Sequence, residues 1–518
     1  MNAGDLLTST ARSHPERVAW IWDDRTRTYG ETNARADALA HDLIALGLER
    51  GDRLALLMEN RPEVIEAMFG CWKAGLAAAP LNARFTPQEI EDHVADAGSR
   101  ALVVGEELAG TVAAIRDRLP SVEHVIQVGG DPAAGFRSWD DAMRCTAPFE
   151  SIAVEPDELA WLAYTSGTTG EPKGAMLTHG VLVHEVLGML ADFFPLEAGN
   201  VGLHAAPLTH GSGHVALVFV TKGCAQVILS KHGFDVARFL EQVERHRVNA
   251  LFLVPTMVKM IVEHPDVDRR DLSSLRWVFY GGSPMYVDDL VRAHDKLGRI
   301  FIQGFGQTES PMTGTVLPAA EHDPSGPLAH RLASCGRARS GIQVRILDPD
   351  DRPVVTGEIG EICIRGGTVM RGYWRRPRES AETLRNGWLH TGDVGRMDED
   401  GYVYILDRSK DLVISGGLNI YPREIEEVLL THPAVSEACV IGIPDGKWGE
   451  AVVAHLVLVP GARATGEAIT DFVADRLAGF KKPKRIVFVD ELAKTPYGKV
   501  DKKAIRAPYW EGRDRLVG

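Results

Sequence analysis

The sequence predicts an α/β protein with a large N-terminal region of α/β sheet subdomains and a small β subdomain, followed by a small α+β C-terminal domain. Three observations support this. Helix-like and strand-like segments alternate over residues 29–105 and again over 201–305; short strand-like runs follow residue 332; and a mixed segment follows residue 408. A chain of 518 residues, 45% of them hydrophobic, also exceeds what one hydrophobic core usually supports.

Apolar periodicity predicts the elements of the two alternating regions. In the first region the helices are expected at 33–46, 62–74 and 87–97, and the strands at 53–58, 77–80 and 101–104. In the second region the strands are expected at 225–229, 250–254 and 277–280, and the helices at 236–246, 256–263 and 287–297. Such alternation predicts parallel sheets that are flanked by helices.

The remaining elements are shorter. Strands separated by Gly, Pro and Asp are expected at 343–347, 360–365 and 402–406. A last α+β unit is expected to contain helices at 422–430 and 468–477 and strands at 434–443 and 451–458. Residues 410–518 hold 16 basic and 15 acidic residues, so nearly all of the net charge of −14 lies in the rest of the chain. We therefore predict two domains, 1–409 and 410–518.

Composition excludes several classes of function. The acidic balance argues against a nucleic-acid partner, which requires a basic footprint. Six cysteines are scattered without a Cys-x-x-Cys pair, which favours reduced thiols over disulfides or a zinc site. Charged residues interrupt the N-terminus, and no stretch is long enough for an integral membrane segment. These features predict a cytoplasmic protein.

The run from Tyr164 to Gly174 is the most informative stretch of the sequence. Its glycines allow the backbone to turn with positive φ and to point N–H groups at an anion, while its hydroxyls and one lysine add donors. The candidate phosphate-binding residues are Thr165, Ser166, Gly167, Thr168, Thr169, Gly170 and Lys173. Pro172 and Gly174 flank the lysine, so the run is not a P-loop. A flexible linker is the structural alternative.

Two further loops follow predicted strands, at the edge where α/β sheets bind ligands. The first contains Gly282 and Ser283. The second comprises Gln303, Gly304, Phe305, Gly306, Gln307 and Thr308, and it ends at Glu309. A carboxylate beside phosphates implies a cation between them, so Glu309 with a hydroxyl from Thr168 or Thr308 would suit Mg²⁺. A plain turn is the alternative for each loop.

Several polar residues near the predicted boundary and the C-terminus carry little signal alone. They are Asp393, Arg408, Lys410, Gly417 and Lys499. His210 and His214 stand four residues apart, but Gly211 and Gly213 disfavour a helix there, so we do not expect zinc. The sequence contains no Gly-x-Ser-x-Gly nucleophile elbow for serine-hydrolase chemistry.

Taken together and in order, these segments resemble the adenylate-forming superfamily of acyl-CoA synthetases, peptide-synthetase adenylation domains and luciferase. The resemblance covers nearly the whole chain and is strongest to bacterial fatty-acyl and aryl carboxylate-CoA ligases. Five motifs carry it: Tyr-Thr-Ser-Gly-Thr-Thr-Gly-Glu-Pro-Lys-Gly, Gly-Phe-Gly-Gln-Thr-Glu, Thr-Gly-Asp, Asp-Arg-Ser-Lys-Asp and Pro-Tyr-Gly-Lys. It implies that a carboxylate attacks the α-phosphate of ATP with release of pyrophosphate, and that CoA then attacks the acyl-adenylate.

The resemblance also implies roles for individual residues. The run 165–173 would hold the β- and γ-phosphates, and Gly282, Ser283 and residues 303–308 would line the adenine and α-phosphate. Thr168 and Glu309 would bind Mg²⁺, while Asp393 and Arg408 would hold the ribose. Lys499 would bridge the α-phosphate and the substrate carboxylate. The C-terminal domain would be mobile and rotate about Lys410, which would open a channel for CoA near Gly417.

The acid is expected to be a medium- or long-chain fatty acid, with His210 beside the acyl pocket. Thr209 stands where many fatty-acyl ligases have Phe, which leaves an aryl acid as an alternative. Two further alternatives are an acyl-AMP ligase that loads a carrier protein and an inactive nucleotide-binding homologue. No insertion is seen between Thr391 and Asp411, and the implied charged residues are all present, which argues against both. The oligomeric state is left open, a homodimer included.

Overall fold

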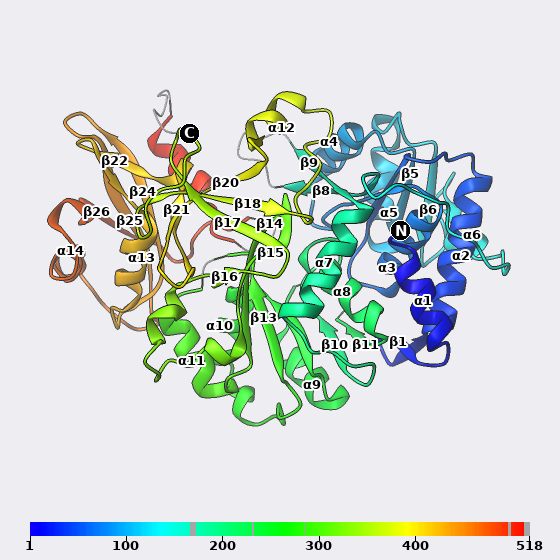
Figure 1. The fold of residues 1–518 in the computed structure, drawn as a ribbon, viewed down its shortest axis with the longest axis horizontal. Helices are drawn as coiled ribbons and strands as arrows, with labels where there is room; N and C mark the ends of the chain where they lie inside the picture. Colours follow the sequence, from blue (N-terminus) through cyan, green and yellow to red (C-terminus); the bar gives the residue numbers. More distant parts are fainter. Residues whose placement is uncertain (166–171, 230–232, 284, 496–498, 512–518) are drawn as a thin grey trace.

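The computed structural model describes residues 1–165, 172–229, 233–283, 285–495 and 499–511, and it contains four sheets (Figure 1). A seven-stranded sheet and a nine-stranded sheet form the large N-terminal region. A five-stranded sheet from the middle of the chain and a five-stranded sheet from its end complete the molecule. The predicted fold class is therefore confirmed.

The seven-stranded sheet is mostly parallel and has the order β7-β6-β5-β3-β4-β8-β9. Its strands are β3 (Arg53–Leu57), β4 (Ala77–Pro80), β5 (Ala101–Gly105), β6 (His124–Val128), β7 (Arg137–Ser138), β8 (Leu159–Thr165) and β9 (Lys173–Thr178). Its helices are α2 (Tyr29–Ala45), α3 (Pro62–Lys73), α4 (Pro87–Ala97), α5 (Glu106–Ala114) and α6 (Trp139–Ala142). β9 pairs antiparallel with β8 at one edge, which the alternation did not predict.

The nine-stranded sheet has the order β16-β15-β14-β13-β12-β10-β11-β1-β2. Its strands are β1 (Val18–Trp22), β2 (Arg25–Thr28), β10 (Val201–His204), β11 (Ala225–Ile228), β12 (Ala250–Leu253), β13 (Trp277–Gly281), β14 (Phe301–Gln307), β15 (Ser310–Leu317) and β16 (Arg337–Ala338). Its helices are α1 (Asp5–Ser13), α7 (His179–Asp192), α8 (Gly211–Lys222), α9 (Val236–His246), α10 (Pro255–Glu263) and α11 (Val287–Leu297). The hairpin β1–β2 joins this sheet through a parallel pairing of β1 with β11.

Helix boundaries follow from local chemistry. α2 begins four residues before the predicted position because Thr28 and Glu31 form a capping box, in which each side chain accepts from the other residue's backbone N–H. Thr86 and Glu89 form the same arrangement at the start of α4. The prediction that glycines prevent a helix at residue 211 is wrong, because α8 begins at Gly211. At Gly213 a Cβ would lie only 2.1 Å from the carbonyl oxygen of Leu208, so close backbone approach requires glycine there.

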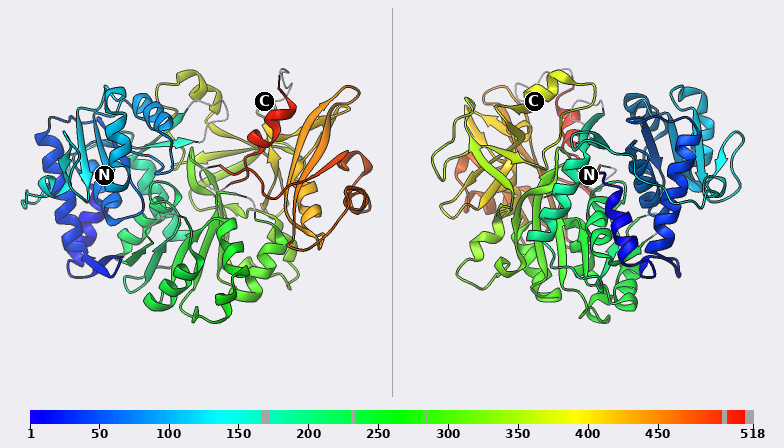
Figure 2. Two further views of the ribbon diagram at one scale, coloured as in Figure 1. Left: turned by 180° about the vertical axis from the view of Figure 1, so that it is seen from behind. Right: turned by 45° about the vertical axis from the view of Figure 1, so that its right-hand side comes forward.

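The two smaller sheets lie side by side on one flank of the molecule (Figure 2). One contains β17 (Ile342–Leu347), β18 (Gly360–Gly366), β19 (Leu384–Arg385), β20 (Trp388–Met397) and β21 (Val403–Arg408), with helix α12 (Pro377–Thr383). The other contains β22 (Val413–Ser415), β23 (Leu418–Ile420), β24 (Val435–Asp445), β25 (Gly449–Leu458) and β26 (Arg485–Phe488), with α13 (Pro422–Leu430), α14 (Gly466–Ala474) and α15 (Lys502–Arg506). The predicted boundary at 409/410 falls in the short 3₁₀ turn Ser409–Asp411 between them.

Packing separates the C-terminal unit from the body. One core lies between the two large sheets and includes the fully buried Trp72, Trp161 and Phe219. A distinct core around Ile425, Leu429 and Val440 belongs to the C-terminal unit alone. Among the described helices, none is long and apolar enough to span a lipid bilayer.

Gly336 gives a test of how β15 and β16 are joined. Its φ is +84°, and an added Cβ would lie 2.0 Å from the carbonyl oxygen of Val316. We expect Gly336→Ala to lower the free energy of unfolding by roughly 2–4 kcal/mol, because it adds a backbone clash to the cost of positive φ. Gly341→Ala is the matched control, since its φ is +79° but no atom lies within 4 Å. Equal losses in chemical denaturation would contradict this account.

Candidate active site

A large cleft of about 1160 Å³ lies where the carboxyl ends of several strands meet the small β sheet and the C-terminal unit. Many residues predicted from the sequence line it together, although they come from segments far apart in the chain. These residues are Lys173, His210, Gly282, Gly304, Gly306, Gln307, Thr308, Glu309, Arg408, Lys410 and Lys499.

Other predicted residues lie elsewhere. Thr165 ends β8, while Ser166, Gly167, Thr168, Thr169 and Gly170 fall outside the described residues. Ser283 follows the cleft-lining Gly282, Phe305 packs against the core of the small β sheet, and Gln303 accepts a hydrogen bond from Tyr280. Gly417 is exposed in the turn between β22 and β23, and it does not line the cleft.

Lys173 and Glu309 are linked by Tyr373. The Lys173 Nζ lies 5.7 Å from the centre of the Tyr373 ring, and the Tyr373 hydroxyl donates to Oε1 of Glu309 at 2.5 Å. Burial and the Glu309 charge raise the pKa of Tyr373, so the phenol remains a neutral donor. Backbone bonds from Trp374 N to Gly174 O and from Met370 N to Glu309 O, both 2.8 Å, place the tyrosine. The sequence analysis missed Tyr373, because only this long-range pairing brings it to the cleft.

Arg408 is held by a buried carboxylate. Its Nε lies 2.8 Å from Oδ1 of Asp393, across the antiparallel pair β20–β21. The other oxygen of Asp393 accepts from Nε2 of Gln307 at 2.6 Å, and the same amide donates to the Thr391 carbonyl. Burial raises the pKa of Asp393, against the opposing effect of Arg408. Asp393 therefore lies just behind the cleft wall and joins β14 to β20.

Three cations approach one another at the C-terminal side of the cleft. Desolvation by the surrounding protein and the charge of Arg408 lower the pKa of Lys499 to about 8, although its side chain remains open to the cleft. The same two causes lower the pKa of Lys410, whereas Asp393 raises the pKa of Arg408. Like charges this close favour an anionic ligand between them.

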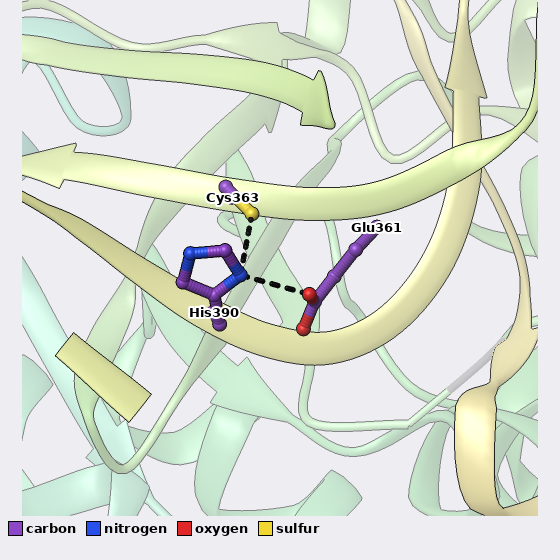
Figure 3. A group of neighbouring side chains, drawn as sticks. All are labelled: Glu361, Cys363 and His390. Atoms are coloured by element: carbon purple, nitrogen blue, oxygen red, sulfur yellow. Dashed lines mark hydrogen bonds and ion pairs between the residues drawn. The ribbon is translucent and has the colours of Figure 1, made fainter. Parts of the chain in front are cut away.

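A cluster of Glu361, Cys363 and His390 lies at the edge of the cleft. The three side chains are of the types that bind metal ions, and their ligand atoms lie within 4.8 Å of one another. Figure 3 shows the imidazole between the thiol and the carboxylate, with His390 Nδ1 2.8 Å from Glu361 Oε2 and 3.4 Å from Cys363 Sγ. Glu361 also accepts from the Gly392 N–H, and Arg385 lies 3.6 Å away. Burial raises the pKa of the Cys363 thiol, so it stays protonated. We interpret the cluster as a support for the turn before Asp393.

His210 is the last residue before α8, and it lines the cleft together with Thr209. Burial and the charges of Lys499 and His214 lower its pKa to about 3, so the imidazole is neutral at physiological pH. His214 bonds to Glu185 on α7. The expectation of no zinc at His210 and His214 stays a prediction.

This arrangement has a clear chemical capacity. Lysines and arginines line a cavity that also carries carboxylates, among them Glu309, which Tyr373 contacts through Oε1. Fixed cations stabilise charge that develops on phosphate oxygens, and a carboxylate beside phosphate is a suitable ligand for a hard divalent cation. The fold and cleft define a two-domain enzyme of the kind that activates a substrate with a nucleotide.

Comparison with known proteins assigns the family. The model described as AMP-binding enzyme matches residues 7–374, and the model described as AMP-binding enzyme C-terminal domain matches residues 424–499. The chain belongs to the AMP-binding enzyme family. This confirms the predicted membership of the adenylate-forming superfamily.

Similar proteins cover nearly the full chain. A medium/long-chain-fatty-acid–CoA ligase, FadD8 of Mycobacterium tuberculosis, is 37% identical over 99% of this chain and 91% of its own length. A feruloyl-CoA synthase of Amycolatopsis sp is 39% identical over 97% of this chain and 98% of its own. The crystal structure of the anthranilate CoA ligase AuaEII with anthranoyl-AMP superposes with a TM-score of 0.91 at 27% identity, over 98% of this chain and 97% of that one.

Removal of Arg408 would test the buried carboxylate. We expect Arg408→Ala to lower the free energy of unfolding by about 1–3 kcal/mol, because Asp393 stays buried without its charged partner. The double variant Arg408→Ala/Asp393→Asn should recover part of the loss, since a neutral amide needs no counter-charge. Additive effects of the two substitutions in urea denaturation would argue against a coupled pair.

Proposed function

We propose that this protein is an AMP-forming carboxylate-CoA ligase, which makes an acyl-adenylate from ATP and a carboxylic acid and then an acyl-CoA. The observation that carries the proposal is the meeting of Lys173 and Glu309 of the N-terminal body with Lys499 of the C-terminal unit in one cleft. The relatives support it, because most of them are CoA ligases. A fatty acid and an aryl acid are both candidates for the carboxylic acid.

The residues of the cleft divide the work of the first half-reaction. Lys173 and the run 165–170 would bind the β- and γ-phosphates, and residues 303–308 with Gly282 and Ser283 would position the adenosine and the α-phosphate. Arg408 lines the cleft and would contact the ribose, oriented by Asp393 behind it. Lys499 would draw the carboxylate and the α-phosphate together, which lowers the cost of bringing two anions into contact.

Magnesium fits the donor set. Glu309 faces the cleft, and Thr308 offers a hydroxyl beside it. Few protein ligands of this oxygen type, together with phosphate oxygens and water, are what Mg²⁺ prefers. Bound there with Thr168, the ion would neutralise phosphate charge. Tyr373 would hold the carboxylate in position through Oε1.

The second half-reaction needs room for a thiol. We propose that residues 410–518 rotate about Lys410, which lies in the turn between β21 and β22, and so withdraw Lys499 from the cleft. The exposed turn at Gly417 would then reach the entry path of CoA. CoA is proposed as the acceptor, and a carrier-protein phosphopantetheine is the alternative.

The activity can be measured with a panel of aliphatic and aromatic acids. We expect acid-dependent release of pyrophosphate, and thioester formation that requires CoA and is absent with holo carrier protein. Thioester formed only on the carrier would replace CoA as the acceptor. If none of the acids in the panel supports pyrophosphate release, the proposal of adenylation is refuted.

Lys499 should give adenylation an alkaline limit. Its pKa of about 8 means that it is an ammonium ion below this pH and a neutral amine above it. We therefore expect kcat/KM for pyrophosphate release to fall roughly tenfold per pH unit above pH 8. Lys499→Arg keeps the positive charge at high pH and should abolish the fall of kcat/KM above pH 8.

Lys499→Ala separates the two half-reactions. It should reduce pyrophosphate release by about 100-fold or more, while it leaves thioester formation from supplied acyl-adenylate largely intact. A flat wild-type profile from pH 7 to 9.5, or an equal loss in both half-reactions, would contradict the role of Lys499.

A further inference from the structure

His214 places a polar edge in an otherwise largely apolar part of the cleft. Its ring lines the cavity, yet the residue is only 6% exposed. Nδ1 bonds to Oε2 of Glu185 at 2.9 Å, and one ring face stacks on Trp161 at 4.2 Å with an interplanar angle of 2°. The ring therefore has one fixed orientation, which is set by the hydrogen bond to Glu185 of α7 and by the stack on the Trp161 ring.

The partner of His214 lies within the influence of a buried positive charge. Glu185 of α7 is fully buried, and the charge of the buried Arg339 acts on it. Arg339 lies against α7 at Gly188, where an added Cβ would be 1.2 Å from Nη1, so only glycine leaves space for the guanidinium. Buried charges are retained where they are paired, and here the arrangement holds Glu185 beside the imidazole.

Nδ1 of His214 is held by Glu185 and one ring face by Trp161, so we take the Nε2 edge as the part of the ring that faces the cavity. Within the described part of the chain, no hydrogen bond reaches this nitrogen. An alkyl chain packed against it would remove it from water without a partner, which is unfavourable for a buried polar atom. A hydroxyl satisfies it in either protonation state, because a hydroxyl both donates and accepts.

We infer that His214 is a specificity-determining residue that hydrogen-bonds a hydroxyl on the acid substrate, and that the preferred acid is a hydroxyaryl carboxylic acid. The inference rests on the proposed function, because it assumes that this cavity holds the acid. Aromatic side chains of the same wall, Trp161, Phe252 and Phe279, suit a planar ring, and Met257 and Met312 adapt to its outline.

The order of groups along the cleft gives the depth of this contact. Lys499, His210 and His214 line the same cavity. Burial lowers the pKa of His210, and the charges of Lys499 and His214 lower it further. His214 is about one helical turn further along α8, roughly 6 Å. A ring that carries a carboxylate at one end and a hydroxyl at the other spans such a distance. The substrate carboxylate would lie at Lys499 and the hydroxyl at His214.

The test compares matched acids in the adenylation half-reaction. Pyrophosphate release is measured for 4-hydroxybenzoate against benzoate and for 4-hydroxycinnamate against cinnamate. We expect the wild-type enzyme to prefer the hydroxy acid of at least one pair by about tenfold or more in kcat/KM. In His214→Phe, which keeps the stack on Trp161, the ratio should fall to about one, with activity on the unsubstituted acid retained or raised.

Two further variants guard against a folding defect. Glu185→Gln/His214→Phe removes the buried carboxylate together with its partner, and it should lose the preference in the same way. His184→Phe is the matched control, since His184 is adjacent to Glu185 but exposed, and its ratio should equal that of the wild type.

The outcomes separate the inference from the function on which it rests. Equal wild-type use of hydroxy and unsubstituted acids, or a preference that survives in both His214 variants, would overturn the role of His214. A higher kcat/KM for saturated fatty acids than for either hydroxy acid would also overturn it. If no acid, aliphatic or aromatic, supports pyrophosphate release, the proposal of adenylation itself is refuted.

Discussion

Mutual repulsion of the cations in the cleft is the constraint on which the site depends. Desolvation, and after it the charge of Arg408, lower the pKa of both Lys410 and Lys499, so the protein holds three positive groups where their charges are disfavoured. Asp393 offsets part of this from behind, where it is shielded from solvent and cannot compete for the ligand. A polyphosphate ligand would supply the missing negative charge. The folded enzyme is therefore electrostatically complementary to its ligand before that ligand binds.

The fold explains how such groups are brought together. Parallel strands place their carboxyl ends at one edge, so the loop after β13 and the end of β14 line the same cleft. The small β sheet then contributes Arg408. Gln307, at the end of β14 in the large sheet, donates hydrogen bonds to Thr391 and Asp393 of β20 in the small sheet. These two bonds fix the small sheet to the large one at the site itself. The geometry of the cleft thus depends on hydrogen bonds between residues that are 84 and 86 positions apart in the chain.

Much of this could be predicted from the sequence. The apolar periods predicted α2, α3, α4, α9, α10, α11, α13 and α14 and many of the central strands, but not the other helices. The glycine-rich and charged motifs predicted Lys173, Glu309, Arg408 and Lys499, which do share one cleft. The antiparallel edge strands and the place of β1 could not be predicted, because they depend on long-range pairing. Tyr373 and Glu185 were missed for the same reason. The sequence was wrongly predicted to avoid a helix at Gly211 and Gly213. The low helix propensity of glycine is overridden there by close packing against Leu208.

The distribution of polar contacts also bears on the proposed rotation. The close ion pairs Lys502–Glu426, Arg506–Asp411 and Lys481–Glu424 all lie within residues 410–518, so a rigid rotation keeps them. In the described part of the chain, the contacts that cross the boundary include hydrogen bonds, such as Lys259 Nζ to Ser436 O and Arg423 N to Asp407, and a long ion pair, Lys502 to Asp407 at 4.0 Å. Each of these hydrogen bonds involves a charged group and contributes about 1.5–3 kcal/mol net. Because the cores of the two units are separate, rotation would exchange polar contacts at the boundary for others without unfolding either unit, which is what a two-step enzyme with one site requires.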